Sequence, residues 1–190
     1  MFPGMRPRFH LGDSRRRGRT FDLQLSQFTI ANSVVMTTLY GVTIPAGALV
    51  NGVVESFLDA TYLQNGGGGS GFTMQVRLGG VVLFEDPTAN YGSSATPHSI
   101  GWRSRLYLEN KVMTAPRITG EHWIAGQPAV VGDGDLGNLA TVLQWSWGGA
   151  SAINMAIAQL LEFRIQHTAA LPSISITRQV GQSDLIRLNG

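Results

Sequence analysis

LATVLQWSWGGASAINMAIAQLLEFRIQH, residues 139–167, is the stretch of this sequence that decides its fold. Apolar side chains recur at every second position, first over residues 139–147 and again over residues 153–165. Because successive side chains of a β-strand point to opposite faces, this period predicts two strands, each with one buried face. Residues 148–152 between them have the length and the glycines of a tight reversal. We therefore expect the two runs to pair as an antiparallel hairpin.

A helix is the alternative for residues 153–163, because the run NMAIAQLLEF is full of helix-forming residues. Such a helix would have mixed apolar and polar faces, and the sequence on both sides is rich in strand-forming residues. Both observations favour the strand.

The period of two recurs along most of the chain. It predicts strands at residues 20–31, 34–40, 53–63, 72–78, 81–84, 99–111, 112–124 and 174–177. A bulge at Ser26-Gln27 would explain a shift of phase in the first of these, and Gly79-Gly80 would turn a second hairpin. Residues 85–96 and 125–138 are rich in turn-forming residues and are expected to be loops. About eight to ten strands without a secure helix predict an all-β protein, a single antiparallel β-sandwich or jelly roll.

The length and composition fit one domain. A chain of 190 residues is long enough for one well-buried core and short for two, since single domains commonly hold about 100–200 residues. We expect a basic extended arm at residues 1–19, the β-sandwich domain at 20–167 and a C-terminal extension at 168–190. Charged residues make up 14% of the chain, below the roughly 25% of average soluble domains, which suits a surface partly covered by partners. No apolar run reaches the roughly 18 residues of a membrane span, so no membrane partner is expected.

Positive charge is concentrated at the N-terminus. Residues 1–20 contain one acidic residue, Asp13, and six arginines: Arg6, Arg8, Arg15, Arg16, Arg17 and Arg19. Their net charge is +5, whereas the residues from 21 onward carry −3. Arginine pairs bidentately with carboxylate or phosphate, which leaves three interpretations open: a tether on an acidic protein surface, an arm on nucleic acid, or a solvated tail. We take the six arginines as the candidate capsid-binding or partner-binding residues.

No motif points to catalysis, a cofactor or a metal. Two segments match G-x-G-x-x-G, beginning at Gly66 and Gly132, but each precedes a strand-like run rather than the helix that a nucleotide phosphate needs. Asp133 and Asp135 resemble half of a calcium loop, yet no glutamate stands at its twelfth position, so a plain acidic turn is favoured. The chain has no cysteine, no G-x-S-x-G serine and no clustered histidine motif. We expect no enzyme, no cofactor and no metal site.

Four tryptophans lie in the predicted strands: Trp102, Trp123, Trp145 and Trp147. They could form a platform for carbohydrate, or they could be core residues that each bury about 150–250 Å². Alternation within strands favours the core for Trp102 and Trp145, and favours it less for Trp123.

The order and spacing of four segments resemble a jelly-roll or β-sandwich domain that recurs in virion proteins of tailed phages. These segments are Thr43-Ile44-Pro45-Ala46-Gly47, Val76 to Phe84, Gly101-Trp102-Arg103, and Trp145 to Ala152 with the closing strand that ends at Ile165. The resemblance covers residues 40–166 and implies a domain that is commonly trimeric and binds the capsid or a cell-surface receptor. The basic arm and the C-terminal extension depart from this pattern and argue against a fibre-tip adhesin.

What the resemblance implies is a bacteriophage virion structural protein on the capsid surface or an attached structure. The first hypothesis is a capsid decoration (cement) or minor head protein, a homotrimer whose partners are the major capsid protein or other virion proteins. One alternative is a receptor-binding or glycan-binding module of a head or tail fibre, acting through loops 64–71, 85–98 and 125–138. A second is a single jelly-roll coat protein with its arm on the genome, for which a net charge of +5 is small.

Overall fold

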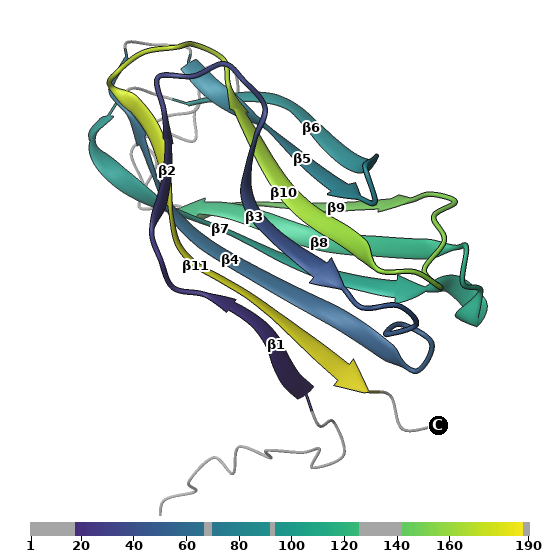
Figure 1. The fold of residues 1–190 in the computed structure, drawn as a ribbon. Helices are drawn as coiled ribbons and strands as arrows, with labels where there is room; N and C mark the ends of the chain where they lie inside the picture. The colour runs from purple at the N-terminus through teal and green to yellow at the C-terminus, as the bar shows by residue number, and fades with distance from the viewer. Residues whose placement is uncertain (1–17, 67–69, 92–93, 126–141, 188–190) are drawn as a thin grey trace, which may run out of the picture.

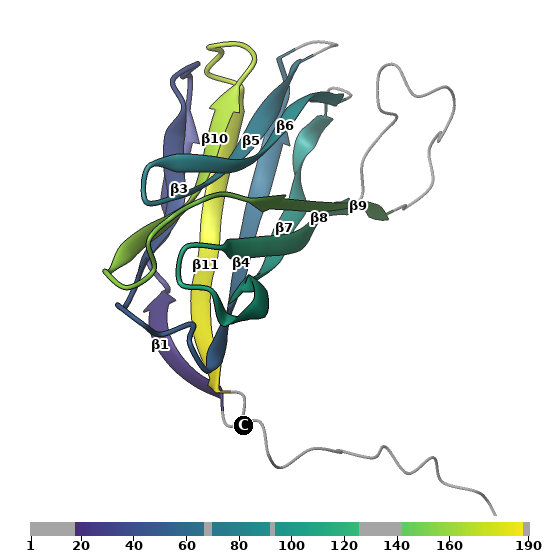
Figure 2. The same cartoon turned by 90° about the vertical axis from the view of Figure 1, so that its right-hand side faces the viewer.

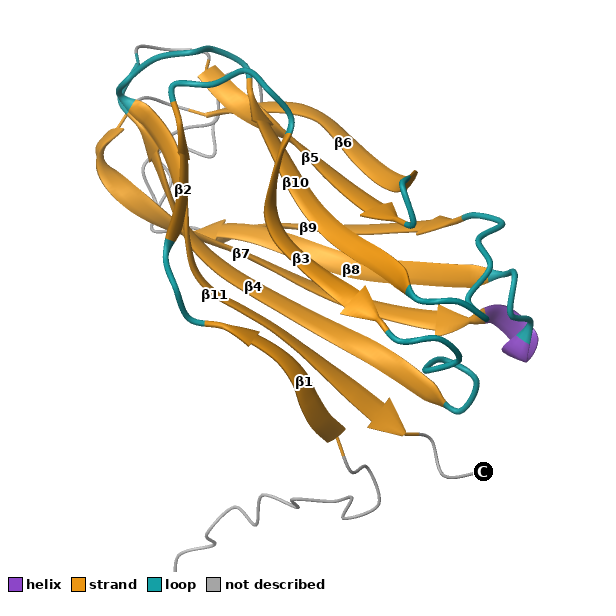
Figure 3. Ribbon diagram, in the orientation of Figure 1, coloured by secondary structure: helices purple, strands orange, loops and turns teal. Residues whose placement is uncertain are grey.

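The structure is a computed structural model that describes residues 18–66, 70–91, 94–125 and 142–187 (Figure 1). Strands fill most of these ranges, and the only helical element among them is a single 3-10 turn (Figure 3). The elements are β1 (Gly18–Gln24), β2 (Phe28–Ala31), β3 (Thr37–Ile44), β4 (Gly52–Gln64), β5 (Ser70–Leu78), β6 (Val81–Tyr91), β7 (Ser94–Leu108), η1 (Glu109–Lys111), β8 (Pro116–Ala125), β9 (Val142–Ala150), β10 (Gln159–His167) and β11 (Ile174–Arg187).

The strands form two antiparallel sheets that face each other (Figure 2). The large sheet has seven strands in the order β1-β11-β4-β7-β8-β9, with β2 also pairing with β11, and the small sheet has the order β3-β10-β5-β6. The predicted all-β antiparallel sandwich is confirmed. In the part of the chain that the structure describes, no helix is long and apolar enough to cross a membrane.

Residues 142–167 do not form the predicted hairpin. Strand β9 pairs with β8 at the edge of the large sheet, whereas β10 lies between β3 and β5 in the small sheet. The segment between them crosses from one sheet to the other, and it buries Ile153 and Met155 on the way. The period of two was correct for β9 and for the part of the second run that forms β10, but residues 153–158 are not a strand, and the pattern carried no information on which sheet each strand would join.

The C-terminal residues are part of the fold rather than an extension. A short strand was expected at residues 174–177, but β11 runs for 14 residues and pairs along its length with β4. Its other side receives β1 and β2. Because Gly18 is the register partner of Ile186, the described chain begins and ends at the same end of the large sheet.

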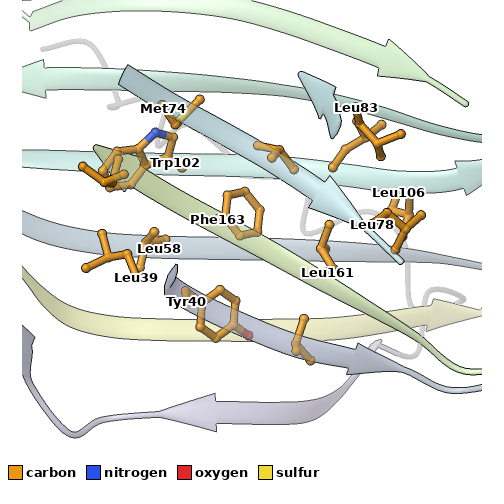
Figure 4. Close-up of a cluster of buried hydrophobic side chains, with 14 of the residues drawn as sticks. Leu39, Tyr40, Leu58, Met74, Leu78, Leu83, Trp102, Leu106, Leu161 and Phe163 are labelled. Carbon is orange, nitrogen blue, oxygen red and sulfur yellow. The ribbon is translucent and has the colours of Figure 1, made fainter. Parts of the chain in front are cut away.

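The core lies between the inner faces of the two sheets (Figure 4). Strand β4 alternates buried and partly exposed residues over its whole length, as the sequence predicted. Trp102 of β7 is 1% exposed, which confirms its predicted place in the core, and it meets Phe72 of β5 edge-on across the interface. The side chain of Trp145 falls outside the described part of the structure. Each large apolar side chain that is fully buried in this way contributes about 1.5–3 kcal/mol.

Residues 85–96 are not the loop that their composition predicted. Strand β6 extends to Tyr91 and β7 begins at Ser94, and residues 86–91 pair with residues 70–74 of β5. Turn-forming residues can occupy strands when cross-strand hydrogen bonds are available, because strand propensity depends strongly on context. The Gly79-Gly80 hairpin between β5 and β6 is confirmed, with both glycines at positive φ.

A break of three residues, 25–27, separates β1 from β2 and faces two residues of β11, so it contains the one extra residue that the predicted bulge at Ser26-Gln27 requires. A buried arginine on β11, Arg178, holds this break in place: its guanidinium donates to the carbonyl oxygens of Ser26 and Leu39 and to the side chain of Gln24. Its Cζ atom lies 5.9 Å from the ring centroid of Phe28. These contacts give the two terminal nitrogens of the buried guanidinium directed acceptors, which lowers the cost of burying a cation.

Candidate functional site

The predicted site residues of the arm lie mostly outside the described structure. Arg6, Arg8, Arg15, Arg16 and Arg17 belong to residues 1–17, so their binding role stays a prediction. Arg19 is described: it is exposed in β1, opposite Leu185 of β11. Gly18 and Arg19, the last two residues of the predicted arm, belong to β1.

The loops proposed for a receptor-binding or glycan-binding module provide no described site. Residues 126–138 and 67–69 lie outside the described ranges, and residues 85–91 and 94–98 belong to strands. A different surface, the outer face of the large sheet, has the geometry of a site.

Two cross-strand rows of outward-facing residues line this outer face. The first row is Gln182, Phe57, Arg103, Glu121 and Ser146, from β11 through β4, β7 and β8 to β9. The second row, one pleat along, is Asp184, Glu55, Arg105 and Thr119. These residues line a groove of about 690 Å³. Since neighbouring strands lie about 4.8 Å apart, five strands give the groove a length of about 19 Å across the sheet.

An aromatic pair borders the groove. The rings of Phe57 and Trp123 are stacked at a centroid distance of 6.2 Å with an interplanar angle of 29°. The Cζ atom of Arg103 lies 5.6 Å from both ring centroids, within the range of a cation–π interaction. Both rings are partly exposed. We call Phe57, Trp123 and Arg103 the aromatic platform.

The platform depends on Gly101. A Cβ atom at this position would lie 2.8 Å from Cη2 of Trp123, which shows that the indole lies flat across β7 in the space a side chain would fill. On the inner face of the large sheet an aromatic ring also lies over a glycine at two places, Trp147 over Gly120 and Tyr40 over Gly181. Trp147 packs against Phe84 of the small sheet, and Tyr40 itself belongs to the small sheet, where it stacks on its register partner Phe163. Among the described residues no second sheet lies over Trp123, and its ring is partly exposed.

The charges of the groove are mixed in sign. The groove is lined by two guanidinium groups, Arg103 and Arg105, and three carboxylates, Glu55, Glu121 and Asp184. Arg105 forms an ion pair of 2.7 Å with Glu55. A surface of alternating sign does not attract polyanions as a uniformly basic surface would.

Asp184 is held by its neighbours at one end of the groove. Its carboxylate accepts a hydrogen bond of 2.6 Å from the hydroxyl of Thr20 and two, of 3.0 and 3.1 Å, from the amide of Gln182. The polar groups at this end are therefore fixed before any ligand arrives.

The strongly shifted titratable groups lie elsewhere, on the inner face. Burial lowers the pKa of His122 to about 4 and also lowers the pKa of His167, where a hydrogen bond with the carbonyl of Ile30 opposes the effect. Both imidazoles are neutral at pH 7 and 1% exposed, so they serve the core rather than a ligand. Among the described residues, no three His, Asp or Glu side chains come together as a metal site.

Comparisons with known proteins give no family. No family model and no curated protein matches the chain. Among solved structures, the CBM2 module of the evolved Dit of Lactobacillus casei BL23 phage J-1 is 8% identical with a TM-score of 0.40, covering 93% of this chain and 99% of that one. Latent PorU of Porphyromonas gingivalis is 8% identical with a TM-score of 0.37, covering 91% and 13%. The VP2 subviral particle of infectious bursal disease virus is 14% identical with a TM-score of 0.33, covering 100% and 47%. Likenesses this distant carry no argument about function.

Sequence reasoning missed the groove for a physical reason. Arg103 and Arg105 lie in the strand predicted at residues 99–111, but nothing local distinguishes them from ordinary surface charges. The site exists because the register places Gln182 beside Phe57 and Phe57 beside Arg103. The one local signal was Gly101, a glycine inside an alternating strand, which often marks a close approach by another group.

Proposed function

We propose that this chain is a bacteriophage virion structural protein that acts by binding, as a capsid decoration (cement) or minor head protein. The observation that carries the proposal is the outer face of the large sheet: the core is closed between the two sheets, yet this face holds a groove lined by two ordered rows of polar and aromatic residues. The order and spacing of the segments at residues 40–166, which resemble phage virion domains, support the virion assignment.

In this proposal the N-terminal arm attaches the protein to the particle. The described part of β1 begins at Gly18, and residues 1–17, if fully extended, span at most about 60 Å. That length is enough to cross a neighbouring subunit. Five of the six candidate arginines lie in this segment, where they can pair with carboxylates of a capsid protein.

The proposed homotrimer has to be supported by surface residues, because the apolar strand faces are already covered within the sandwich. Strand β1 is an edge of the large sheet, and Leu23 and Leu25 near its end are more than half exposed. Such an edge is suited to contacts between subunits. Light scattering at micromolar concentration should give the mass of three chains, and the mass of one chain would contradict the homotrimer.

Truncation tests the attachment. Deleting residues 1–17 should leave the denaturation midpoint unchanged, because every described strand remains, and should strongly reduce binding to particles that lack the protein. Replacing Arg15, Arg16 and Arg17 together by alanine should weaken binding measurably, whereas each single replacement should have little effect, since an exposed ion pair contributes about 0–1 kcal/mol. Electron microscopy of particles with and without the protein provides the readout: density over the head supports decoration.

Two outcomes would contradict this assignment. Equal binding of the truncated and full chains to empty capsids would exclude the arm as the tether. A loss seen only with genome-filled particles would instead favour the coat-protein alternative, in which the arm contacts nucleic acid.

A further inference from the structure

We infer that the groove on the outer face of the large sheet binds a neutral glycan, with a sugar ring stacked on the aromatic platform. The inference deepens the proposed function, because it gives a ligand to a binding protein whose arm would hold it to the particle. It places the glycan on strands β11, β4, β7, β8 and β9.

Stacking on the platform is the first contact. A pyranose ring has a face of C–H groups, which are weakly positive, and the face of an aromatic ring carries the negative part of its quadrupole. Trp123 lies flat over Gly101 and is stacked on Phe57, so the two rings form a continuous surface rather than isolated side chains. A flat surface of this kind matches a sugar ring and leaves the sugar's hydroxyl groups pointing sideways into the groove.

Planar polar groups supply the second contact. Arg103, Glu121 and Gln182 lie in one row across the sheet, and each presents two donor or acceptor atoms in one plane. Two such atoms can bind two neighbouring hydroxyls of one sugar. Gln182 and Asp184 already hydrogen-bond each other, so less conformational entropy is lost when a ligand binds.

The charge of the groove favours a neutral glycan over a polyanion. Nucleic acid bases also stack on aromatic side chains, but single-strand binders combine stacking with a positively charged groove. Here Glu55, Glu121 and Asp184 outnumber Arg103 and Arg105, and Arg105 is paired with Glu55. The lining therefore carries a net negative charge, which disfavours a phosphate or sulfate chain.

The shape favours a chain of sugars over one small ligand. The groove crosses five strands and is about 19 Å long, and it is open to solvent along the outer face. A linear oligosaccharide can therefore lie across the strands with one ring on the platform and the next rings beside Arg105 and Asp184.

Calorimetric titration of the full chain tests the inference. The probes are hexasaccharides of glucose, galactose and mannose in α-linked and β-linked forms, with single-stranded DNA and a sulfated polysaccharide as anionic comparisons. We expect at least one neutral hexasaccharide to bind, and Trp123→Ala to weaken that binding at least about tenfold. Arg77→Ala, a substitution of an exposed arginine on the small sheet, should change the affinity by less than about twofold.

Gly101→Ala is the sharpest variant, because it removes no side chain from the groove or the platform. Its methyl group would push the Trp123 ring off the sheet, and the exposed outer face gives that ring room to move. We expect a glycan affinity reduced at least about fivefold with the denaturation midpoint close to that of the unmodified chain. A glycan that binds Gly101→Ala and Trp123→Ala as tightly as it binds the unmodified chain would overturn the assignment to the platform.

The remaining outcomes separate this inference from the proposed function. Failure of all the neutral hexasaccharides at millimolar concentration, or binding of the anionic chains alone, overturns the glycan assignment even if the arm still attaches the protein to particles. Glycan binding by a protein that is absent from particles would overturn the virion assignment and leave the glycan site standing.

Discussion

The inner and outer faces of the seven-stranded sheet place aromatic rings over glycines in the same way, but with different consequences. On the inner face, Trp147 over Gly120 is stacked on Phe84 of the small sheet, and the ring over Gly181 is Tyr40, which comes from the small sheet itself. On the outer face, Trp123 over Gly101 is stacked on Phe57 beside Arg103, and no second sheet of the described residues lies over it. The inner rings contribute to stability, whereas the outer ring is free to serve binding. An aromatic ring over a glycine can therefore either stabilise the core or form a binding surface, depending on whether a second sheet covers the ring.

The largest expected effect comes from a matched pair of tryptophans on neighbouring strands. Trp102→Ala should lower the free energy of unfolding by about 3–5 kcal/mol, since it empties a fully buried site. Trp123→Ala should lower it by only about 1 kcal/mol, because the ring loses one stacking partner and no core contact. Chemical denaturation measures both values.

A control is needed because Trp102→Ala could prevent folding altogether. Trp102→Phe keeps an aromatic ring in the core and should be folded. Its free energy of unfolding should fall by an amount between the decreases for Trp102→Ala and Trp123→Ala. If Trp123→Ala were as destabilising as Trp102→Ala, the outer ring would be part of the stabilising core and the comparison of the two faces would fail.

The fold was predictable where the inward residues are apolar. Strand β4 and the strand around Trp102 could be assigned from their period of two because their inner positions hold large apolar side chains. Strand β11 could not, since after Ile176 its inward positions include Arg178, Gly181 and Ser183. Tyr40 fills the space above Gly181, so the apolar group that completes this part of the core comes from another strand.

The candidate site was less predictable than the fold. Outward polar residues look alike along a sequence, and only the register of five strands brings Gln182, Phe57 and Arg103 into one row. Sequence reasoning placed the candidate residues in the basic arm and assigned any glycan site to loops. It had no means of locating a site that is made by residues more than a hundred positions apart.

Acidification should affect the inner face in a predictable direction. In the folded state burial holds the pKa of His122 at about 4, whereas an unfolded chain has a histidine pKa near 6.5. Between these pH values the unfolded state binds more protons than the folded state. The contribution of neutral His122 to the free energy of unfolding is therefore fully present above about pH 6.5 and decreases by about 1.4 kcal/mol per pH unit below it. We expect a loss of about 2 kcal/mol at pH 5 from His122 alone.

Denaturation midpoints at pH 7, 6 and 5 check this dependence. His122→Gln should reduce the dependence of the denaturation midpoint on pH. The double variant with His167→Gln should reduce it further, because burial lowers the pKa of both histidines. An unchanged slope in the double variant would show that the inner face is not the source of the acid sensitivity.

The smallest effect is expected on the outer face, at Glu55. This carboxylate forms an ion pair with Arg105, but it is also the register partner of Asp184 on β11. Glu55→Gln removes a partly exposed ion pair that contributes about 0–1 kcal/mol and relieves a repulsion between like charges directly opposite each other, which is of similar size. The two changes oppose each other, so the free energy of unfolding should change by less than about 0.5 kcal/mol at low salt, and by still less in 1 M salt, where both interactions are screened.

Arg105→Gln is the matched variant: it removes the same ion pair but leaves the repulsion, so it should be slightly more destabilising than Glu55→Gln. A loss above about 1.5 kcal/mol for Glu55→Gln would mean that the outer face stabilises the sheet as the inner face does, and the division of roles between the two faces would have to be abandoned.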